Sequence, residues 1–345
     1  MTTTARPRSC ASCDMTACAL HIGHGPLIEP VSGKTSWLLD DAWPEYSSYL
    51  ARIAAPDDQI LAPGLFGTAR IARYEWLHPA TRHAATFATA RRHWSMRRVA
   101  TAAGSVRQRA YATSDQRLAT ALAKAVDYRS EHLVVAQAWL PWLDRLGLLG
   151  GRSFDVLMSR YPLADIHARL DAAACDYAGP LDPSIADFRA SDDLVETEHR
   201  LLGQARRLIS PHNDICVTFA DRAIRLAWHR PPTASAKPGK RTAFIGSTLP
   251  RDRPDLAARW ASRSTDPLIV FGSASSDHRV WQGVPVEPRP WTLAWLDDIG
   301  TIVHPATMTT QPRRLLRALA NGVTIHATPA CGLPPTDYRT LTLSP

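Results

Sequence analysis

The chain has 345 residues, 45% of them hydrophobic and 21% charged, and its 40 Lys and Arg against 32 Asp and Glu give a formal net charge of +8. This apolar fraction excludes a wholly disordered chain, and the length favours two domains. The longest apolar stretch, residues 133–143, is interrupted by Gln137 and Pro141 and is far shorter than the ~20 residues that span a bilayer. Because the first residues lack the apolar core of a secretory signal, we expect a cytoplasmic protein without a transmembrane helix.

Residues 1–30 contain a cluster of cysteine and histidine side chains. Thiolate and imidazole are the ligands of structural zinc, and the candidates are Cys10, Cys13, Cys18 and His21. An iron–sulfur cluster is the alternative metal centre, completed by a distant cysteine such as Cys175, Cys216 or Cys331. A reduced segment that binds no metal is the third interpretation, because cytoplasmic thiols stay reduced.

The next part of the chain, residues 31–230, alternates short apolar runs with amphipathic stretches. Strands are predicted over residues 36–39, 59–61, 132–140 and 154–158. Helices are predicted over residues 68–77, 113–126, 164–174 and 194–209, and the second of these begins at a Ser114/Asp115 cap. Alternation of this kind is typical of an open parallel sheet with helices on its faces.

Residues 69–110 are rich in arginine. They contain nine arginines against a single acid, Glu75, so this segment alone carries a net charge equal to that of the whole chain. The candidates for a basic patch are Arg91, Arg92, Arg97 and Arg98. His93, Trp94 and Tyr111 lie between the arginines, which favours an anionic partner such as a nucleic acid or a glycolipid. The alternative is a solvated basic surface with no binding role.

A proline-rich linker follows at residues 230–241, and the alternating pattern then starts again. Strands are predicted over residues 242–247, 266–273, 301–306 and 323–333, and helices over residues 254–261 and 312–322. We therefore expect a second doubly wound domain over residues 231–345, after a first domain over residues 31–230.

The segments FIGSTLPRDRPDLA, LIVFGS, VWQGVPVE and QPRRLLRALANGVTIHATPACGL resemble the nucleotide-sugar-binding domain of GT-B glycosyltransferases, closest to family 4. The resemblance covers about residues 113–335, and the last segment is its most specific part. It implies an α/β protein with two doubly wound Rossmann-type domains that face each other across a cleft. It also implies transfer of a sugar from a nucleotide-diphosphate donor that binds between the domains.

Residues at the expected donor site include glycines, hydroxyl side chains and several arginines. A diphosphate binds well to helix N-termini and to guanidinium groups that follow parallel strands. The candidates are Gly246, Ser247, Arg251, Arg253, Arg313 and Arg314, together with Thr309 and Arg317, which stand where the family usually has two glutamates. The glycine-flanked His24 resembles the N-terminal catalytic histidine of such enzymes.

The leading hypothesis is a glycosyltransferase that acts on an anionic acceptor, for example a modified nucleic-acid base or a glycolipid. A small molecule or a protein is the other acceptor that stays open. The absent glutamates keep an alternative open, a non-catalytic GT-B-like protein that binds nucleic acid. A third hypothesis is a nucleotide-sugar epimerase on two Rossmann-like domains.

Overall fold

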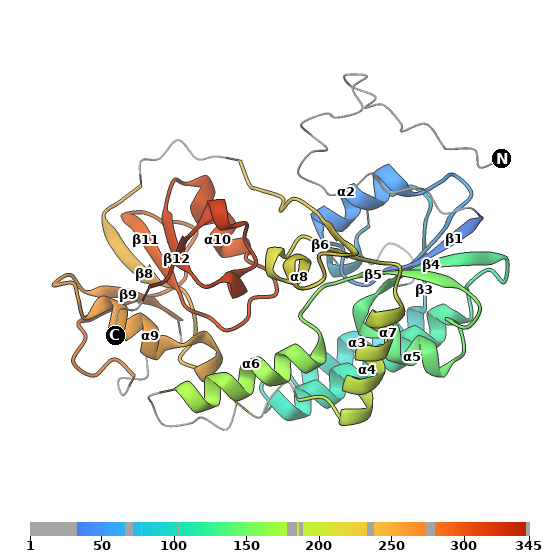
Figure 1. Ribbon diagram of the computed structural model, residues 1–345, viewed down its shortest axis with the longest axis horizontal. Coiled ribbons are helices and arrows are strands. Elements are labelled where there is room, and N and C mark those ends of the chain that lie inside the picture. The colour runs from blue at the N-terminus through green and yellow to red at the C-terminus, as the bar shows by residue number, and fades with distance from the viewer. Residues whose placement is uncertain are drawn as a thin grey trace, which may run out of the picture. The chain divides into compact units, whose positions relative to one another are not determined.

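A computed structural model describes residues 33–65, 72–76, 78–102, 104–177, 185, 189–232, 238–272 and 280–342 (Figure 1). Contacts divide the chain into two compact units. One comprises Met1–Ala90, Gln116–Met158 and Gln204–Ala227, and the other comprises Arg91–Asp115, Ser159–Gly203 and Trp228–Pro345. No helix among the described residues is long and apolar enough to cross a membrane.

The first unit is built on a seven-stranded, entirely parallel sheet in the order β3-β2-β1-β4-β5-β6-β7. Its strands are β1 (Lys34–Leu38), β2 (Gln59–Pro63), β3 (Thr81–Ala84), β4 (Ser130–Ala136), β5 (Ser153–Leu157), β6 (Arg207–Ser210) and β7 (Ala223–Arg225). The chain winds outward in both directions from the central β1–β4 pair, which confirms the prediction of a doubly wound sheet.

The helices before the linker lie between these strands in the sequence. They are α2 (Pro44–Ile53), α3 (Thr86–Arg98), α4 (Gly104–Ala123), α5 (Leu140–Arg145), α6 (Leu163–Asp176), α7 (Asp192–Gln204) and α8 (Asn213–Thr218). Apolar side chains on α2 pack in the core, where Tyr49 meets Trp37 of β1 edge to face at 6.1 Å between ring centroids. The Tyr46 hydroxyl donates to the Met158 carbonyl at 2.5 Å, so α2 is also fixed by a buried hydrogen bond.

Four local predictions for this part of the chain need correction. The predicted strand over residues 132–140 is too long, since β4 ends at Ala136 and a 3₁₀ turn over Gln137–Trp139 follows. The predicted cap at Ser114 and Asp115 is wrong, because α4 begins ten residues earlier and the Ser114 hydroxyl donates to the Ala110 carbonyl within the helix. The predicted helix over residues 194–209 is too long, since α7 ends at Gln204 and the buried β6 follows. Of the predicted helix over residues 68–77, the described part contains only a 3₁₀ turn at Ala72–Tyr74.

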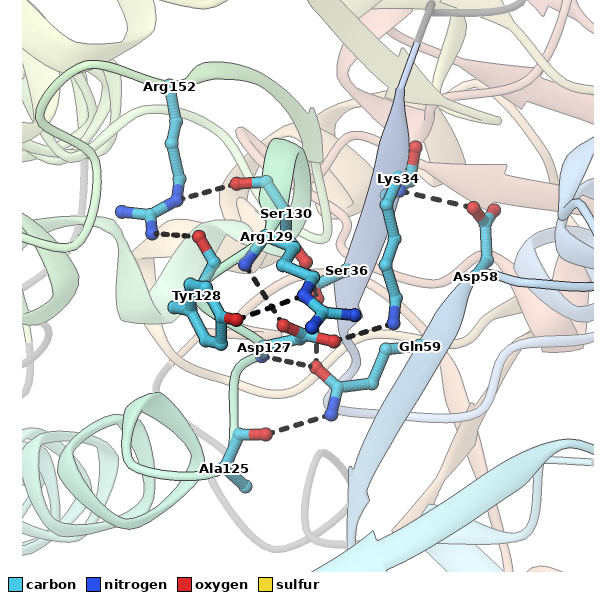
Figure 2. Close-up of polar contacts among 11 residues, drawn as sticks. Lys34, Ser36, Asp58, Gln59, Ala125, Asp127, Tyr128, Arg129, Ser130 and Arg152 are labelled. Atoms are coloured by element: carbon cyan, nitrogen blue, oxygen red, sulfur yellow. Dashed lines mark hydrogen bonds and ion pairs between the residues drawn. The ribbon is translucent and has the colours of Figure 1, made fainter.

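Polar side chains join the amino-terminal ends of β1, β2 and β4 (Figure 2). The Ser36 hydroxyl donates to the Gln59 side-chain oxygen at 2.9 Å and lies 2.6 Å from the Ser130 hydroxyl. The same Gln59 oxygen accepts from the Asp127 backbone N–H, and Lys34 pairs with the Asp127 carboxylate at 2.6 Å. These bonds fix the register of three strands at the edge opposite to the one where parallel sheets bind ligands.

A buried charge cluster lies deeper in the same sheet. The Asp155 carboxylate on β5 is 2% exposed and accepts two hydrogen bonds from the Arg206 guanidinium, at 2.9 and 2.6 Å. The imidazole of His132 on β4 approaches it at 3.3 Å. Burial by itself raises the pKa of Asp155, but the hydrogen bonds from His132 and Arg206 outweigh it and hold that pKa below its usual value.

The second unit contains a six-stranded parallel sheet in the order β10-β9-β8-β11-β12-β13. The strands of this sheet and the helices between them, orange to red in Figure 1, are β8 (Arg241–Phe244), α9 (Pro254–Ala261), β9 (Leu268–Phe271), β10 (Val286–Arg289), β11 (Ile299–His304), α10 (Arg313–Ala320), β12 (Thr324–Ala327) and β13 (Arg339–Thr340). The two sheets separate at the predicted linker. Two doubly wound α/β sheets are thus confirmed, while the cleft between domains and the predicted domain limits stay predictions.

Candidate functional site

The second unit contains a pocket of about 570 Å³ at the carboxyl ends of its central strands. β8 and β11 are neighbours from which the chain winds in opposite directions, and open α/β sheets bind ligands at this switch point. The lining residues come from the loops after four strands and from the start of α10: Ile245, Gly246, Ser247, Arg251, Asp252, Phe271, Trp291, His304, Met308, Thr309, Gln311, Pro312, Arg313, Arg314 and Leu315. The volume lies within the ~300–1,000 Å³ of small-molecule sites.

The loop after β8 turns tightly around Gly246. A Cβ atom at this position would lie 2.4 Å from the Phe244 ring and 3.0 Å from the Asp252 Cβ, so only glycine fits without rearrangement. The Asp252 carboxylate accepts a hydrogen bond from the Ser247 backbone N–H at 2.8 Å and another from the Ser247 hydroxyl. The backbone N–H of Ser247, one of the candidate donor-site residues, is therefore already used to close the loop.

The N-terminus of α10 opens into the pocket without a side-chain cap and without an acidic residue in its first turn. The first N–H groups of a helix have no partner within the helix, and together with the helix dipole they favour an anion at this point. Arg313 and Arg314 add two full positive charges. Aromatic rings hold both guanidinium groups, since Arg313 lies 5.4 Å from the centre of the Trp228 ring and Arg314 lies 3.8 Å from that of Trp291.

His304, the last residue of β11, is the buried titratable group of the pocket. Its Nε2 lies 2.8 Å from the Thr309 hydroxyl, whereas its Nδ1 is buried without a hydrogen-bond partner among the described residues. Burial lowers the pKa of His304 to about 4, although the nearby Asp252 carboxylate acts in the opposite direction. At neutral pH the imidazole is therefore uncharged.

Titration of His304 gives a testable pH dependence. Because its folded pKa lies below the unfolded value of ~6.5, the unfolded chain takes up the proton first, and stability falls as the pH drops from about 6.5 to 4. Over this pH range, we expect the unfolding free energy of His304→Gln to fall by up to about 3 kcal/mol less than that of the wild type. Urea unfolding curves of both proteins at several pH values measure it, and parallel pH profiles would contradict the assignment.

The structure brings six of the eight predicted donor residues into one pocket: Gly246, Ser247, Arg251, Thr309, Arg313 and Arg314. Arg253 does not line it, because its guanidinium forms a two-point ion pair with Asp255 at 2.9 and 3.0 Å. Arg317 does not line it either, since this exposed arginine donates to the Leu293 carbonyl at 2.7 Å.

The predicted basic patch is also changed by the structure. Arg91, Arg97 and Arg98 are exposed on α3, but Arg92 is 4% exposed and lies 2.9 Å from the Asp115 carboxylate on α4. Arg92 therefore joins two helices and is not part of the exposed patch, because its charge is neutralised where it is buried.

The predicted metal ligands Cys10, Cys13, Cys18 and His21, and the catalytic candidate His24, lie outside the described residues. Within the part of the chain that the structure describes, no group of three His, Cys, Asp or Glu side chains could hold a metal ion. Of the proposed distant cysteines, Cys216 and Cys331 are buried and Cys175 is exposed.

Sequence reasoning missed several residues of the pocket, among them Asp252, Phe271, Trp291 and His304. The position of His304 at the end of an apolar strand was the available signal, because strand ends meet at the ligand edge of a parallel sheet. Trp291 carried no such signal, since it reaches the pocket from the loop after the short strand β10.

No family model matches the sequence, and no curated protein is significantly similar to it. Solved structures are similar in architecture. A UDP-glucosyltransferase from Polygonum tinctorium shares 12% identity, with 87% of this chain and 80% of that chain covered and a TM-score of 0.41. An α,α-trehalose-phosphate synthase (UDP-forming) from Burkholderia vietnamiensis shares 8% identity, with 86% of this chain and 83% of that chain covered and a TM-score of 0.41. A Medicago truncatula protein complexed with UDP-glucose shares 10% identity, with 87% of this chain and 81% of that chain covered and a TM-score of 0.42.

Proposed function

We propose that the chain is a glycosyltransferase of the GT-B type, which binds a nucleotide-diphosphate sugar in the pocket of the second unit and transfers the sugar to an acceptor. One observation carries the proposal. At the switch point of a parallel sheet, a pocket combines an uncapped helix N-terminus with Arg251, Arg313 and Arg314. A nucleoside diphosphate is the leaving group of sugar transfer, and its charge matches this lining.

In the proposed reaction, the bond between the anomeric carbon and the diphosphate oxygen breaks, and the electron pair leaves with the diphosphate. A bond forms between the same carbon and an acceptor oxygen, whose proton is released. The arginines and the N–H groups of α10 stabilise the negative charge that develops on the departing oxygen. Because Trp228 and Trp291 hold the guanidinium groups in place, little rearrangement is needed when that charge appears.

The donor sugar and ribose would be bound differently from what the family resemblance implies. Thr309, at the position of the first glutamate, pairs with His304, and Arg317, at the position of the second, points to Leu293. Asp252 is the one acid among the residues that line the described pocket. We propose that the uncharged His304 and the Asp252 carboxylate take over hydrogen bonds to donor hydroxyl groups.

The acceptor in this proposal is anionic, a glycolipid or a modified nucleic-acid base. Exposed Arg91, Arg97 and Arg98 on α3 support a negatively charged partner. Residues 231–345 then form the donor domain, and residues 31–230 form the acceptor domain.

The test is a panel of UDP-, GDP- and dTDP-sugars. We expect one nucleotide class to raise the Tm, because a ligand at a hundred times its Kd stabilises the folded state by about 2.7 kcal/mol. We also expect slow release of the matching nucleoside diphosphate by hydrolysis of the sugar bond. If no nucleotide stabilises the protein and none is hydrolysed, the donor site is wrongly assigned, whereas binding without turnover in the presence of acceptors would favour a non-catalytic protein.

A further inference from the structure

Helix α3 presents a stripe of alternating aromatic and arginine side chains. Phe87, Arg91, Trp94 and Arg98 are spaced four, three and four residues apart, which places them on one face of a helix. All four are exposed, with 82% of Phe87 and 55% of Trp94 accessible. Two large aromatic side chains on one exposed helix face are uncommon on a surface with no partner.

The opposite face of α3 fixes the orientation of this stripe. Arg92 points away from it and pairs with Asp115, and its guanidinium lies 5.9 Å from the centre of the Tyr111 ring on α4. Thr89 is buried, and its hydroxyl donates to the Ala85 carbonyl at 3.0 Å. A buried ion pair is costly to break, so α3 keeps the stripe outward.

The chain around the stripe is basic in sequence. The sequence has no Asp or Glu from residue 76 to residue 114, and Arg97 adds a further exposed charge on the same helix. The Arg98 guanidinium lies 3.4 Å from the centre of the Trp94 ring. A cation stacked on indole can enter the boundary between lipid headgroups and acyl chains together with the ring.

We infer that the stripe of Phe87, Arg91, Trp94 and Arg98 docks the protein on an anionic phospholipid surface. The rings enter the headgroup boundary and the guanidinium groups contact lipid phosphates, as in interfacial helices. A nucleic acid fits less well, because single strands bind in basic grooves and the stripe lies on a convex helix face. Arg98 also covers one face of the indole on which a base would stack. The inference goes beyond the proposed function and does not depend on it.

The experiment measures binding of the full chain, without any nucleotide, to sedimented vesicles. One set is phosphatidylcholine alone, and the other contains one part phosphatidylglycerol to two parts phosphatidylcholine. We expect binding to the anionic vesicles only. The variant Arg91→Gln/Arg98→Gln should weaken it about 30-fold, on the basis of about 1 kcal/mol for each arginine near the surface. The variant Phe87→Ser/Trp94→Ser should weaken it by about tenfold or more, because it removes the apolar contact.

Matched controls are Arg259→Gln, which removes an exposed charge elsewhere, and Leu293→Ser, which truncates a side chain that is 88% exposed. Both should bind like the wild type, and circular dichroism checks that every variant is folded. Equal binding to neutral and anionic vesicles, or unchanged binding of both stripe variants, would overturn the inference. Binding to a single-stranded or duplex oligonucleotide in place of vesicles would overturn it in favour of a nucleic-acid surface.

Discussion

The double variant Arg313→Gln/Arg314→Gln is expected to bind the donor nucleotide about a hundredfold more weakly than the wild type, or worse. Hydrogen bonds to charged groups contribute about 1.5–3 kcal/mol each, and this variant removes two such donors from the first turn of α10. Isothermal titration with the nucleoside diphosphate that stabilises the protein measures the change.

The reason for so large an effect is that both charges are preorganised. Trp228 and Trp291 hold the guanidinium groups at the helix N-terminus before any ligand arrives, so little side-chain entropy is lost on binding. Arg251 and the α10 N–H groups remain in the variant, so weak binding should persist. The Tm of the ligand-free variant should stay close to that of the wild type, because neither arginine is part of the core.

Arg317→Gln is the control for this experiment. It removes the same charge from the same helix, but the Arg317 guanidinium binds the Leu293 carbonyl outside the pocket. We expect its affinity to remain within about twofold of the wild type, because only screened long-range attraction is lost. If Arg317→Gln weakened binding as much as the double variant, the effect would reflect net charge, and the assignment of the pocket would fail.

The convergence of candidate residues on one pocket could be predicted where those residues follow strand ends directly. Gly246 and Ser247 come straight after the apolar run of β8, and Arg313 and Arg314 begin a helix with a clear periodic pattern. Because parallel strands bring their carboxyl ends to one edge, these segments converge without knowledge of the tertiary structure. The doubly wound order of both sheets could be predicted for the same reason.

Side-chain direction and pairing were not visible in the sequence. Arg253 is only two residues from Arg251, yet it adopts a left-handed conformation with φ of 51° and pairs with Asp255. In the sequence, Arg92 is one more positive charge in a basic segment. In the structure it pairs with Asp115, which lies more than twenty residues away along the chain. Local composition gives net charge, but long-range packing decides which charges remain exposed.

Asp155→Asn is expected to lower the free energy of unfolding by about 3 kcal/mol. The buried Asp155 carboxylate accepts two hydrogen bonds from the Arg206 guanidinium and lies next to the His132 imidazole. An asparagine amide at this position is uncharged, so both groups lose their negatively charged partner. Breaking a buried pair by removing one partner costs about 3–5 kcal/mol, and we take the lower end because Arg206 is partly solvated. Urea unfolding at pH 7, followed by circular dichroism, measures the loss.

Asp171→Asn removes the same type of charge from an exposed pair with Arg189, and it should leave the urea midpoint unchanged within error. The pH dependence separates electrostatics from packing. Because hydrogen bonds from His132 and Arg206 hold the pKa of Asp155 below its ordinary value near 4, its contribution is complete above that pH and is lost as the pH falls through the folded pKa. The stabilities of the wild type and Asp155→Asn should therefore converge in acid. A difference that stayed constant down to low pH would instead show that the asparagine disturbs packing, since a lost charge pair cannot destabilise a protein in which the carboxyl is already neutral.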